Sequence, residues 1–402
     1  MEMENIIPKK IRLPLLLLLV GFVFWFGLKP GWNQVESDFP NYYVSAKMLL
    51  EGNLQDAYSI EKFDAKIREY SPTARGLFVM YPPATALLME PLCLLDILSA
   101  KRIWLIISLL LMVHSIFITS RLMHFTLFQS ALIFLLAGFN LANDFMLGQI
   151  YTCMLWLLLI GWDSFINKKY IQSSLAWAVL AALKFLPLFF LPFLLYKKEY
   201  KTLMYFTIFF CLLQSIVLLQ GGAAVFVAFA ESFNSNYLSA QVANLVPTSV
   251  QYQSVKSLLN ATMPLNGQYG IWHLAINYCW QFIWILWAVF TMIKFRNTLN
   301  FLMLAISNCI LVLLLLEVGS ATYHLLFCFF PLLYVFQYAS PNYCRAMLFL
   351  WIMMGFFPTI QSKLLGSITL LSYSRLLLLV LFSFLFFWSL KPNNNNGLQI
   401  AA

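Results

Sequence analysis

The chain has 402 residues, of which 61% are apolar and only 10% are charged. Soluble domains carry about 25% charged residues, so most of this chain must face lipid or other helices, and a soluble protein is excluded. The net charge of +9 does not indicate a nucleic-acid-binding protein, because the Lys and Arg residues stand in small groups between apolar runs instead of in one stripe.

The first strongly apolar run, residues 13–28, follows Lys9, Lys10 and Arg12, which is the arrangement of a signal peptide. No cleavage site made of small residues follows the run before Trp32. We therefore expect a first span that is retained in the protein.

Further apolar runs predict a polytopic membrane protein, since a helix needs about 20 apolar residues to cross the hydrocarbon core. The expected spans are residues 13–30, 103–120, 126–143, 150–165, 202–220, 271–293, 298–316, 324–338, 346–362 and 370–390. Two other apolar segments are ambiguous. Residues 84–98 form a short run that two acidic residues and a proline interrupt, and residues 171–196 contain Lys184 and two prolines.

The positive-inside rule resolves both ambiguous segments. Only one arrangement places all basic groups between the spans in the cytoplasm: Arg121, Lys168, Lys169, Lys197, Lys198, Lys201, Lys294, Arg296, Arg345 and Lys391. It keeps residues 84–98 on the outer side as an embedded helix that does not cross. It also makes residues 171–196 go out and come back as two short helices, with residues 184–187 at the outer turn. The prediction is about 12 spans with both termini in the cytoplasm.

The organisation expected from this topology is a single transmembrane domain, residues 1–392, with a disordered polar tail, residues 393–402. Two long segments face outside, residues 31–102 and residues 221–270. Within the first, apolar residues recur at helical spacing and charged residues take the other face, which is typical of a helix lying in the membrane interface. The apolar positions are Ile60, Phe63, Ile67 and Tyr70.

Six segments carry a family resemblance through their order along the chain. They are SDFPNYYVSAKMLLEGN (37–53), FVMYPPATALLMEPL (78–92), LGQIYTCMLWLLL (147–159), LAWAVLAALKFLPLFFLPFLL (175–195), QYQSVKSLL (251–259) and SATYHLLFCFFPLL (320–333). In this order they resemble glycosyltransferase family 87, a group with the GT-C fold that includes mannosyltransferases using polyprenyl-phosphate-mannose. The resemblance implies an all-α, GT-C-like bundle with an active site at the outer membrane face, a polyprenyl-phosphate-sugar donor, and neither a cofactor nor a metal.

Transfer from such a donor needs a base for the acceptor hydroxyl and groups that stabilise the departing phosphate. Asp38 is the candidate base, because it follows the first span and stands where the resemblance places the catalytic carboxylate. Its alternative role is a helix N-cap before Phe39. Glu36 and Asp144 are the secondary acidic candidates, and Asp144 at a helix end could simply be solvated.

Lys184 and His324 are the candidates for the donor phosphate. An ammonium within an apolar run needs an anion, and the resemblance implies that the anion is the donor phosphate; the alternative is that Lys184 reaches to the interface. His324 stands in Ala-Thr-Tyr-His at the position that matches the histidine of the family. Its alternative is a packed histidine at a helix end.

Uncharged residues on the outer side are the candidates for contacts with sugar hydroxyls. Gln149, Gln253 and Ser254 could serve there, or could hydrogen-bond between helices. Tyr81 could line the sugar pocket, although Tyr-Pro-Pro first indicates the start of the helix at residue 84. No metal site is expected, because the cysteines lie in apolar segments without CxxC spacing.

The predicted function is transfer of a hexose, in the first place mannose, from a polyprenyl-phosphate donor to a hydroxyl of a glycolipid or glycan, with inversion. A secondary transporter or a flippase for lipid-linked sugars is the alternative from another class, and it predicts charges at mid-membrane and two similar halves. A third reading is a non-catalytic scaffold for glycan assembly. The expected location is the bacterial inner membrane, with the active site on the periplasmic face.

Overall fold

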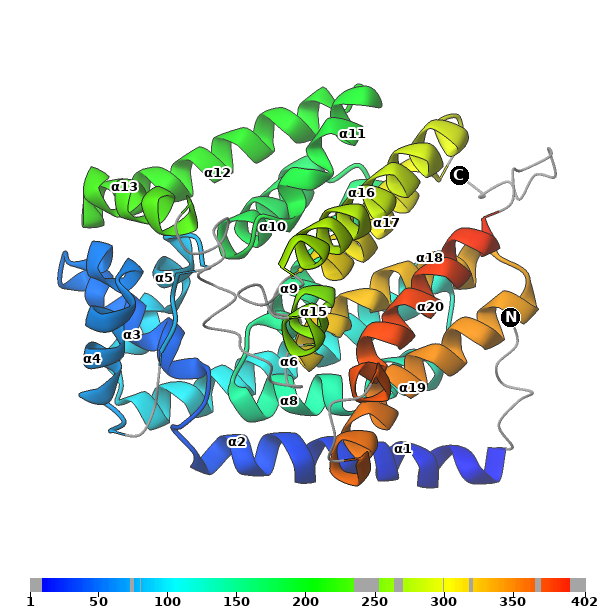
Figure 1. The fold of residues 1–402 in the computed structure, drawn as a ribbon, viewed down its shortest axis with the longest axis horizontal. Coiled ribbons are helices and arrows are strands. Elements are labelled where there is room, and N and C mark those ends of the chain that lie inside the picture. Colours follow the sequence, from blue (N-terminus) through cyan, green and yellow to red (C-terminus); the bar gives the residue numbers. More distant parts are fainter. Residues whose placement is uncertain are drawn as a thin grey trace.

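The computed structural model describes residues 9–72, 76–79, 81–234, 253–263, 270–298, 300–317, 321–365 and 370–390. All regular structure in this part of the chain is helical, which confirms the predicted all-α class (Figure 1). The predicted tail and most of the second outer segment lie outside the described residues.

The N-terminal helix is one rod along an edge of the molecule (Figure 1). It consists of α1 (Lys9–Val23), a π-helical turn η2 (Phe24–Leu28) and α2 (Lys29–Asn33). Together they form an apolar stretch from Lys10 to Asn33 that is long enough to cross a membrane. The expected first span is therefore present as a helix.

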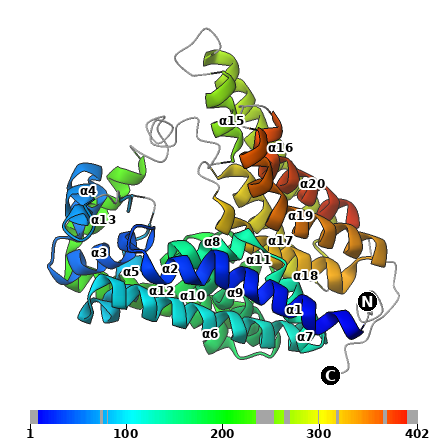
Figure 2. The same cartoon turned by 90° about the horizontal axis from the view of Figure 1, so that it is seen from below.

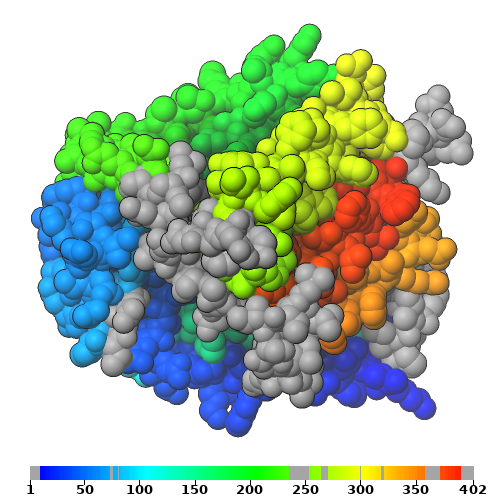
Figure 3. Space-filling model, in the orientation of Figure 1, coloured from blue at the N-terminus to red at the C-terminus, as the bar shows by residue number. Residues whose placement is uncertain are grey.

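Short helices follow at one end of the molecule: α3 (Phe39–Leu50), η3 (Leu54–Tyr58), α4 (Ile60–Arg68), α5 (Ala84–Met89) and η4 (Glu90–Leu94). In α4 the side chains of Phe63 and Ile67 are wholly buried while Glu61 and Lys62 are exposed, as the amphipathic pattern predicts. The apolar helix at residues 84–94 is too short to cross a membrane. Figure 3 shows the helices of this end (blue) meeting α13 (Ala223–Ser232, green), where the ring of Tyr58 contacts that of Phe229.

The remaining helices form the bundle. Their first group is α6 (Ile97–Met123), α7 (Leu127–Leu135), α8 (Phe139–Leu147), α9 (Tyr151–Ile166), α10 (Tyr170–Leu183), η5 (Leu186–Phe189), α11 (Leu191–Tyr196) and α12 (Tyr200–Gly221). The second is α15 (Val255–Thr262), α16 (Gly270–Phe295), α17 (Phe301–Leu316), η7 (Thr322–Cys328), α18 (Phe329–Tyr338), α19 (Pro341–Leu365), η8 (Leu370–Tyr373) and α20 (Ser374–Ser389). Figure 2 shows α15, α16, α19 and α20 as an arm that projects from the layer containing α1, α6 and α12.

Four described helices are long and apolar enough to cross a membrane, and up to six spans result if each of two bent pairs counts as one. The four are Lys10–Asn33, Ile97–Met123, Tyr200–Gly221 and Gly270–Phe295. Several other expected spans are helices of 10–17 residues, among them α9, α17 and α20. The count of about 12 crossings thus stays a prediction, because these helices are shorter than the hydrocarbon core requires.

The expected uninterrupted span at residues 126–143 is wrong, because the chain bends by 74° between α7 and α8. Gly138 lies at the bend with φ of +56°, a conformation that favours glycine. A Cβ atom there would come within 2.7 Å of the carbonyl oxygen of Gly355, so the close packing of α19 also requires glycine. The expected span at 324–338 likewise begins as the 3-10 helix η7, and only α18 is α-helical.

The break expected inside residues 171–196 is present. Helices α10 and η5–α11 form a pair bent by 114°, and Lys184 lies in the break with extended backbone (φ −151°, ψ 144°). A lysine in this position leaves the helix and can turn its ammonium away from lipid, toward the interior of the bundle.

Several basic residues at or near helix ends make contacts with neighbouring helices at one end of the bundle. Arg12 lies over the ring of Phe128, Arg121 pairs with Asp163 at the end of α9, and Lys197 donates to the carbonyl of Arg296. These contacts join the ends of three pairs of helices, α1 with α7, α6 with α9, and α11 with α16. In the described part of the chain, Arg121, Lys197 and Arg296 thus lie at helix ends distant from α3, α4 and α13.

Candidate active site

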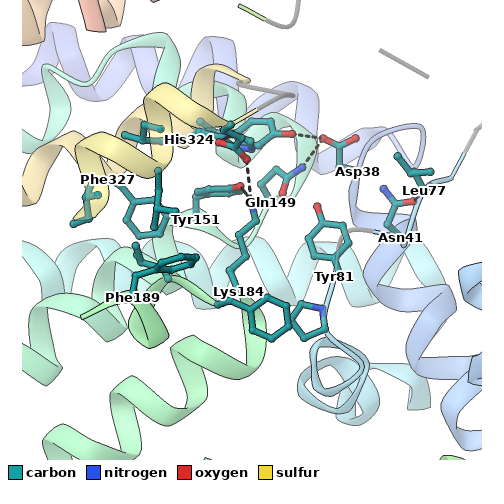
Figure 4. A pocket seen from close by; sticks show the side chains of 18 of the residues that line it. Asp38, Asn41, Leu77, Tyr81, Gln149, Tyr151, Lys184, Phe189, His324 and Phe327 are labelled. Atoms are coloured by element: carbon teal, nitrogen blue, oxygen red, sulfur yellow. Dashed lines mark hydrogen bonds and ion pairs between the residues drawn. The ribbon is translucent and has the colours of Figure 1, made fainter. Parts of the chain in front are cut away.

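A cavity of about 290 Å³ is lined by Tyr151 at the start of α9, whereas the Arg121–Asp163 pair lies at the other end of that helix. It is formed where the chain leaves α2 and enters α3, where α8 meets α9, where α10 breaks, and where α17 passes into η7. Figure 4 shows the polar side chains around it. The polar lining residues are Asp38, Asn41, Tyr81, Gln149, Tyr151, Lys184, Glu317, Tyr323 and His324.

Asp38 forms one wall of the cavity. It occupies the N-cap position of α3, but its side chain makes no capping hydrogen bond. Its Oδ2 atom instead accepts from Gln149 Nε2 at 2.5 Å and from the Tyr323 hydroxyl at 3.3 Å (Figure 4). Burial raises the pKa of Asp38 above its ordinary value, although these two bonds and the charge of Lys101 partly offset that rise.

The amide of Gln149 is oriented by its neighbours. The hydroxyl of Tyr42 donates to Gln149 Oε1, and this hydroxyl lies 3.0 Å from that of Tyr81. Because Oε1 is occupied as an acceptor, the amide must present its Nε2 donor to Asp38. In the described part of the chain, the hydrogen bonds to the Asp38 carboxylate come from neutral donors and end on Oδ2, so that Oδ1 is available for a proton.

Lys101 supports this wall from behind. Its side chain is wholly buried, and its ammonium donates to Gln34 O, Ser37 Oγ and Met146 O at 2.7, 3.0 and 3.1 Å. These bonds tie the segment before Asp38 to the end of α8. Sequence reasoning missed Lys101, although a lysine at the outer end of a predicted span runs against the positive-inside rule and was a usable signal.

A charged cluster forms the opposite wall. Lys184 donates to the hydroxyl of Tyr151 and to Glu317 Oε1, the latter at 3.4 Å, while Glu317 Oε2 lies 2.6 Å from His324 Nδ1. The rings of His324 and Tyr151 stack with centroids 4.7 Å apart. Burial alone would raise the pKa of Glu317, but His324 and Lys184 hold it at about 2, so this carboxylate is ionised.

The rest of the cavity is apolar. Its lining there comes from the break after α10, from α17 and from η7: Phe185, Leu186, Phe189, Ile310, Leu313, Leu314 and Phe327. The cavity therefore offers one region to a polar or charged group and another to hydrocarbon, as an amphiphilic ligand requires.

Five predicted site residues come together at this cavity from distant parts of the chain. They are Asp38, Tyr81, Gln149, Lys184 and His324. Tyr81 also has the expected structural part, since α5 begins directly after Pro82 and Pro83.

Asp144 and Glu36 do not line the cavity among the described residues. The buried carboxylate of Asp144 accepts from the backbone N–H groups of Tyr151 and Thr152 and from the Thr152 hydroxyl at 2.6 Å. It therefore satisfies the first turn of α9. Glu36 is exposed in the segment between α2 and α3.

Gln253 and Ser254 also lie outside the described lining. Ser254 caps α15 by accepting from Ser257 N at 3.1 Å. Gln253 donates to Ser372 O and accepts from the backbone N–H of Arg375, so it holds the start of α20. Arg375 is buried and interacts electrostatically with Tyr323 and His324. Gln253 thus fixes the backbone at Arg375, which follows it by more than a hundred residues.

Sequence reasoning missed several residues of the cavity, above all Glu317, Tyr151 and Tyr323. Glu317 was detectable in principle, since it directly follows an apolar run on the side that carries Asp38 and Lys184. Among the described residues no three His, Cys, Asp or Glu side chains come together as a metal site.

Comparison with protein families identifies the class of this molecule. The pattern of glycosyltransferase family 87 matches residues 78–316, more than half of the chain. Searches of curated proteins and of solved structures gave no significant match. The chain belongs to glycosyltransferase family 87; it is a glycosyltransferase, and its long apolar helices indicate a membrane protein.

The matched region contains Gln149 and Lys184, whereas Asp38 and His324 lie outside it. The structure joins the two sets, because Gln149 bonds Asp38 and Glu317 links Lys184 to His324. The cavity is thus shared between the matched region and both flanks.

Proposed function

We propose that this glycosyltransferase moves a hexose, in the first place mannose, from a polyprenyl-phosphate donor to a hydroxyl of a glycolipid or glycan, with inversion. The observation that carries the proposal is the cavity with two unlike walls, a carboxylate held by neutral donors facing a cluster of Lys184, Glu317 and His324. The apolar lining next to that cluster suits the lipid of such a donor.

In the proposed reaction Asp38 accepts the proton of the acceptor hydroxyl while the acceptor oxygen attacks C1 of the sugar. The bond between C1 and the phosphate oxygen breaks, and its electron pair stays on the phosphate. The lipid phosphate gains a negative charge in this step, which Lys184 and His324 stabilise. A single carboxylate suffices because phosphate leaves readily, unlike the alcohol released by a glycosidase.

The proposed orientation follows from the separation of charges. Cytoplasmic connections are enriched in Lys and Arg, and Arg121, Lys197 and Arg296 lie at helix ends opposite those that line the cavity. We place the cavity at the outer face of the membrane, where a lipid-linked donor can enter from the bilayer. A bacterial inner membrane is the proposed location.

The test is an assay of the purified protein in lipid with radiolabelled polyprenyl-phosphate-mannose and a membrane lipid extract. The Asp38→Asn variant keeps the size of the side chain and removes the base, so transfer should fall by about 10³-fold or more. Glu36→Gln is the matched control, since it neutralises an exposed carboxylate two residues away, and it should retain transfer.

Equal transfer by wild type and Asp38→Asn would reject Asp38 as the base and keep the class of reaction. Transfer from a nucleotide sugar but not from the lipid donor would reject the proposed donor. Binding of the lipid-linked sugar without any transfer would favour a flippase or transporter.

A further inference from the structure

The contact of His324 with Glu317 determines which nitrogen of the imidazole ring carries a proton. Its Nδ1 atom lies 2.6 Å from an oxygen of Glu317, which is ionised and can only accept a hydrogen bond. Nδ1 must therefore carry a proton. The other ring nitrogen, Nε2, makes no hydrogen bond with any residue that the structure describes, and the side chain lines the cavity.

The hydrogen bond to Glu317 also determines the protonation state in which His324 could bind a phosphate. With a proton on Nδ1, a neutral ring has only a lone pair on Nε2, and a lone pair cannot bond a phosphate oxygen. A phosphate next to Nε2 needs a second ring proton. A histidine placed between a carboxylate and a phosphate must therefore be the imidazolium cation.

We propose that Glu317 and His324 form a carboxylate–imidazole dyad that takes up a proton when the donor phosphate binds and presents Nε2–H to it. The inference rests on the proposed function for the identity of the ligand, a phosphodiester. Glu317 is a positioning residue in this dyad, because it acts through the ring of His324 and holds Lys184 at the same time.

Charged and titratable groups from each neighbouring element act on the ring of His324. Burial of the ring opposes its protonation most strongly, Glu317 after α17 favours it, and Lys184 after α10 and Arg375 on α20 also oppose it. Tyr151 of α9 stacks on the ring and Tyr323 contacts its edge, and both bring uncharged hydroxyls. Because burial and the nearby cations oppose the second proton in the empty site, an arriving phosphate anion is the change that favours proton uptake.

The dyad also has a consequence for the transfer step. When the bond between C1 and the phosphate oxygen breaks, the lipid phosphate changes from a diester with one negative charge to a monoester with a second developing charge. The imidazolium can hydrogen-bond that oxygen or pass its Nε2 proton to it, which leaves neutral His324 still bonded to Glu317. The dyad therefore stabilises charge that exists only late in the reaction.

The experiment measures proton uptake when the purified protein in lipid nanodiscs binds polyprenyl-phosphate-mannose without acceptor. Calorimetric titrations near pH 8 in buffers of different ionisation enthalpy give the number of protons taken up. Wild type should take up close to one proton per donor. Glu317→Gln should take up almost none, because the amide can donate to Nδ1 and leave the proton of a neutral ring on Nε2. Glu317→Asp should restore uptake, and Glu36→Gln should match wild type.

Transfer assays across pH complete the test. In wild type, kcat/KM for the donor should fall as the pH rises past neutrality, whereas Glu317→Gln should lose about 10-fold to 100-fold at neutral pH and show no such fall. Binding without proton uptake, or a Glu317→Gln profile that is lower but unchanged in shape, would overturn the dyad. Transfer by wild type without proton uptake would reject the dyad and keep the proposed function. Proton uptake without transfer would support the dyad and reject the proposed transfer reaction.

Discussion

The two walls of the cavity each contain a half-buried carboxylate, and their neighbours give them opposite properties. Asp38 is bonded by Gln149 and Tyr323, which are neutral, and burial raises its pKa. Glu317 lies against His324 and Lys184, and its pKa falls to about 2. Environment therefore separates a group that can accept a proton from one that stays an anion.

The comparison shows why the role of a carboxylate cannot be inferred from its exposure or its side-chain type alone. A base must have a pKa close to the working pH, whereas a counter-anion must remain charged beside its cations. Neutral donors on one wall, and the Lys184 ammonium with the Nδ1–H group of His324 on the other, achieve this difference within one cavity. Changes to either set of neighbours should disturb the two carboxylates in different ways.

The largest effect among such changes is expected for Lys184→Met. This substitution removes the cation at the proposed phosphate site and takes away one of the two partners of Glu317. We expect kcat/KM for the lipid donor to fall by about 10²-fold to 10³-fold. Steady-state kinetics with varied donor concentration measures it, with Lys184→Arg as the variant that keeps the charge. A Lys184→Met enzyme within about twofold of wild type would show that the phosphate binds elsewhere.

A smaller effect is expected for Gln149→Leu, which changes the wall of Asp38. The Gln149 bond favours the charged form of Asp38, so its loss should raise the pKa of Asp38 further. The base is active when deprotonated, so the acidic limb of the kcat profile should move to higher pH. Activity at neutral pH should fall by about 10-fold.

The pH profile separates this effect from a contact of Gln149 with the sugar. A uniform loss with the acidic limb unchanged would mean that Gln149 binds substrate instead of tuning Asp38. Tyr42→Phe offers a milder version of the same change, because it removes the donor to Gln149 Oε1 and leaves the bond to Asp38 possible.

Much of the fold could be predicted because each feature has a local signal. The alternation of apolar and charged residues around Phe63 predicted α4, and Lys184 with its neighbouring prolines predicted the broken pair of α10 and α11. The bend at Gly138 could not be predicted, because it depends on the approach of Gly355 from a helix more than two hundred residues later.

The residues of the candidate site also divide into those with a local signal in the sequence and those without one. Asp38, Lys184 and His324 stand out in the sequence because polar groups beside apolar runs need a partner or a task. Glu317 and Arg375 gain their significance only from contacts with residues far along the chain. Asp144 has the same sequence signal as Asp38, and only the structure shows that it bonds the first turn of α9.

The smallest effect on catalysis is expected for a substitution of Asp144, which does not line the cavity as Asp38 and Glu317 do. In Asp144→Asn one oxygen acceptor remains for the three donors from Tyr151 and Thr152. We expect a loss of about 1–3 kcal/mol in stability, with kcat and the pH profile within about twofold of wild type. Thermal unfolding in nanodiscs, followed by the fluorescence of the tryptophans, measures the loss. Asp56→Asn is the matched control, because Asp56 and its partner Lys62 are both exposed and such pairs stabilise by less than about 1 kcal/mol. A loss of transfer in Asp144→Asn at unchanged stability would instead make Asp144 a third carboxylate that acts in the reaction.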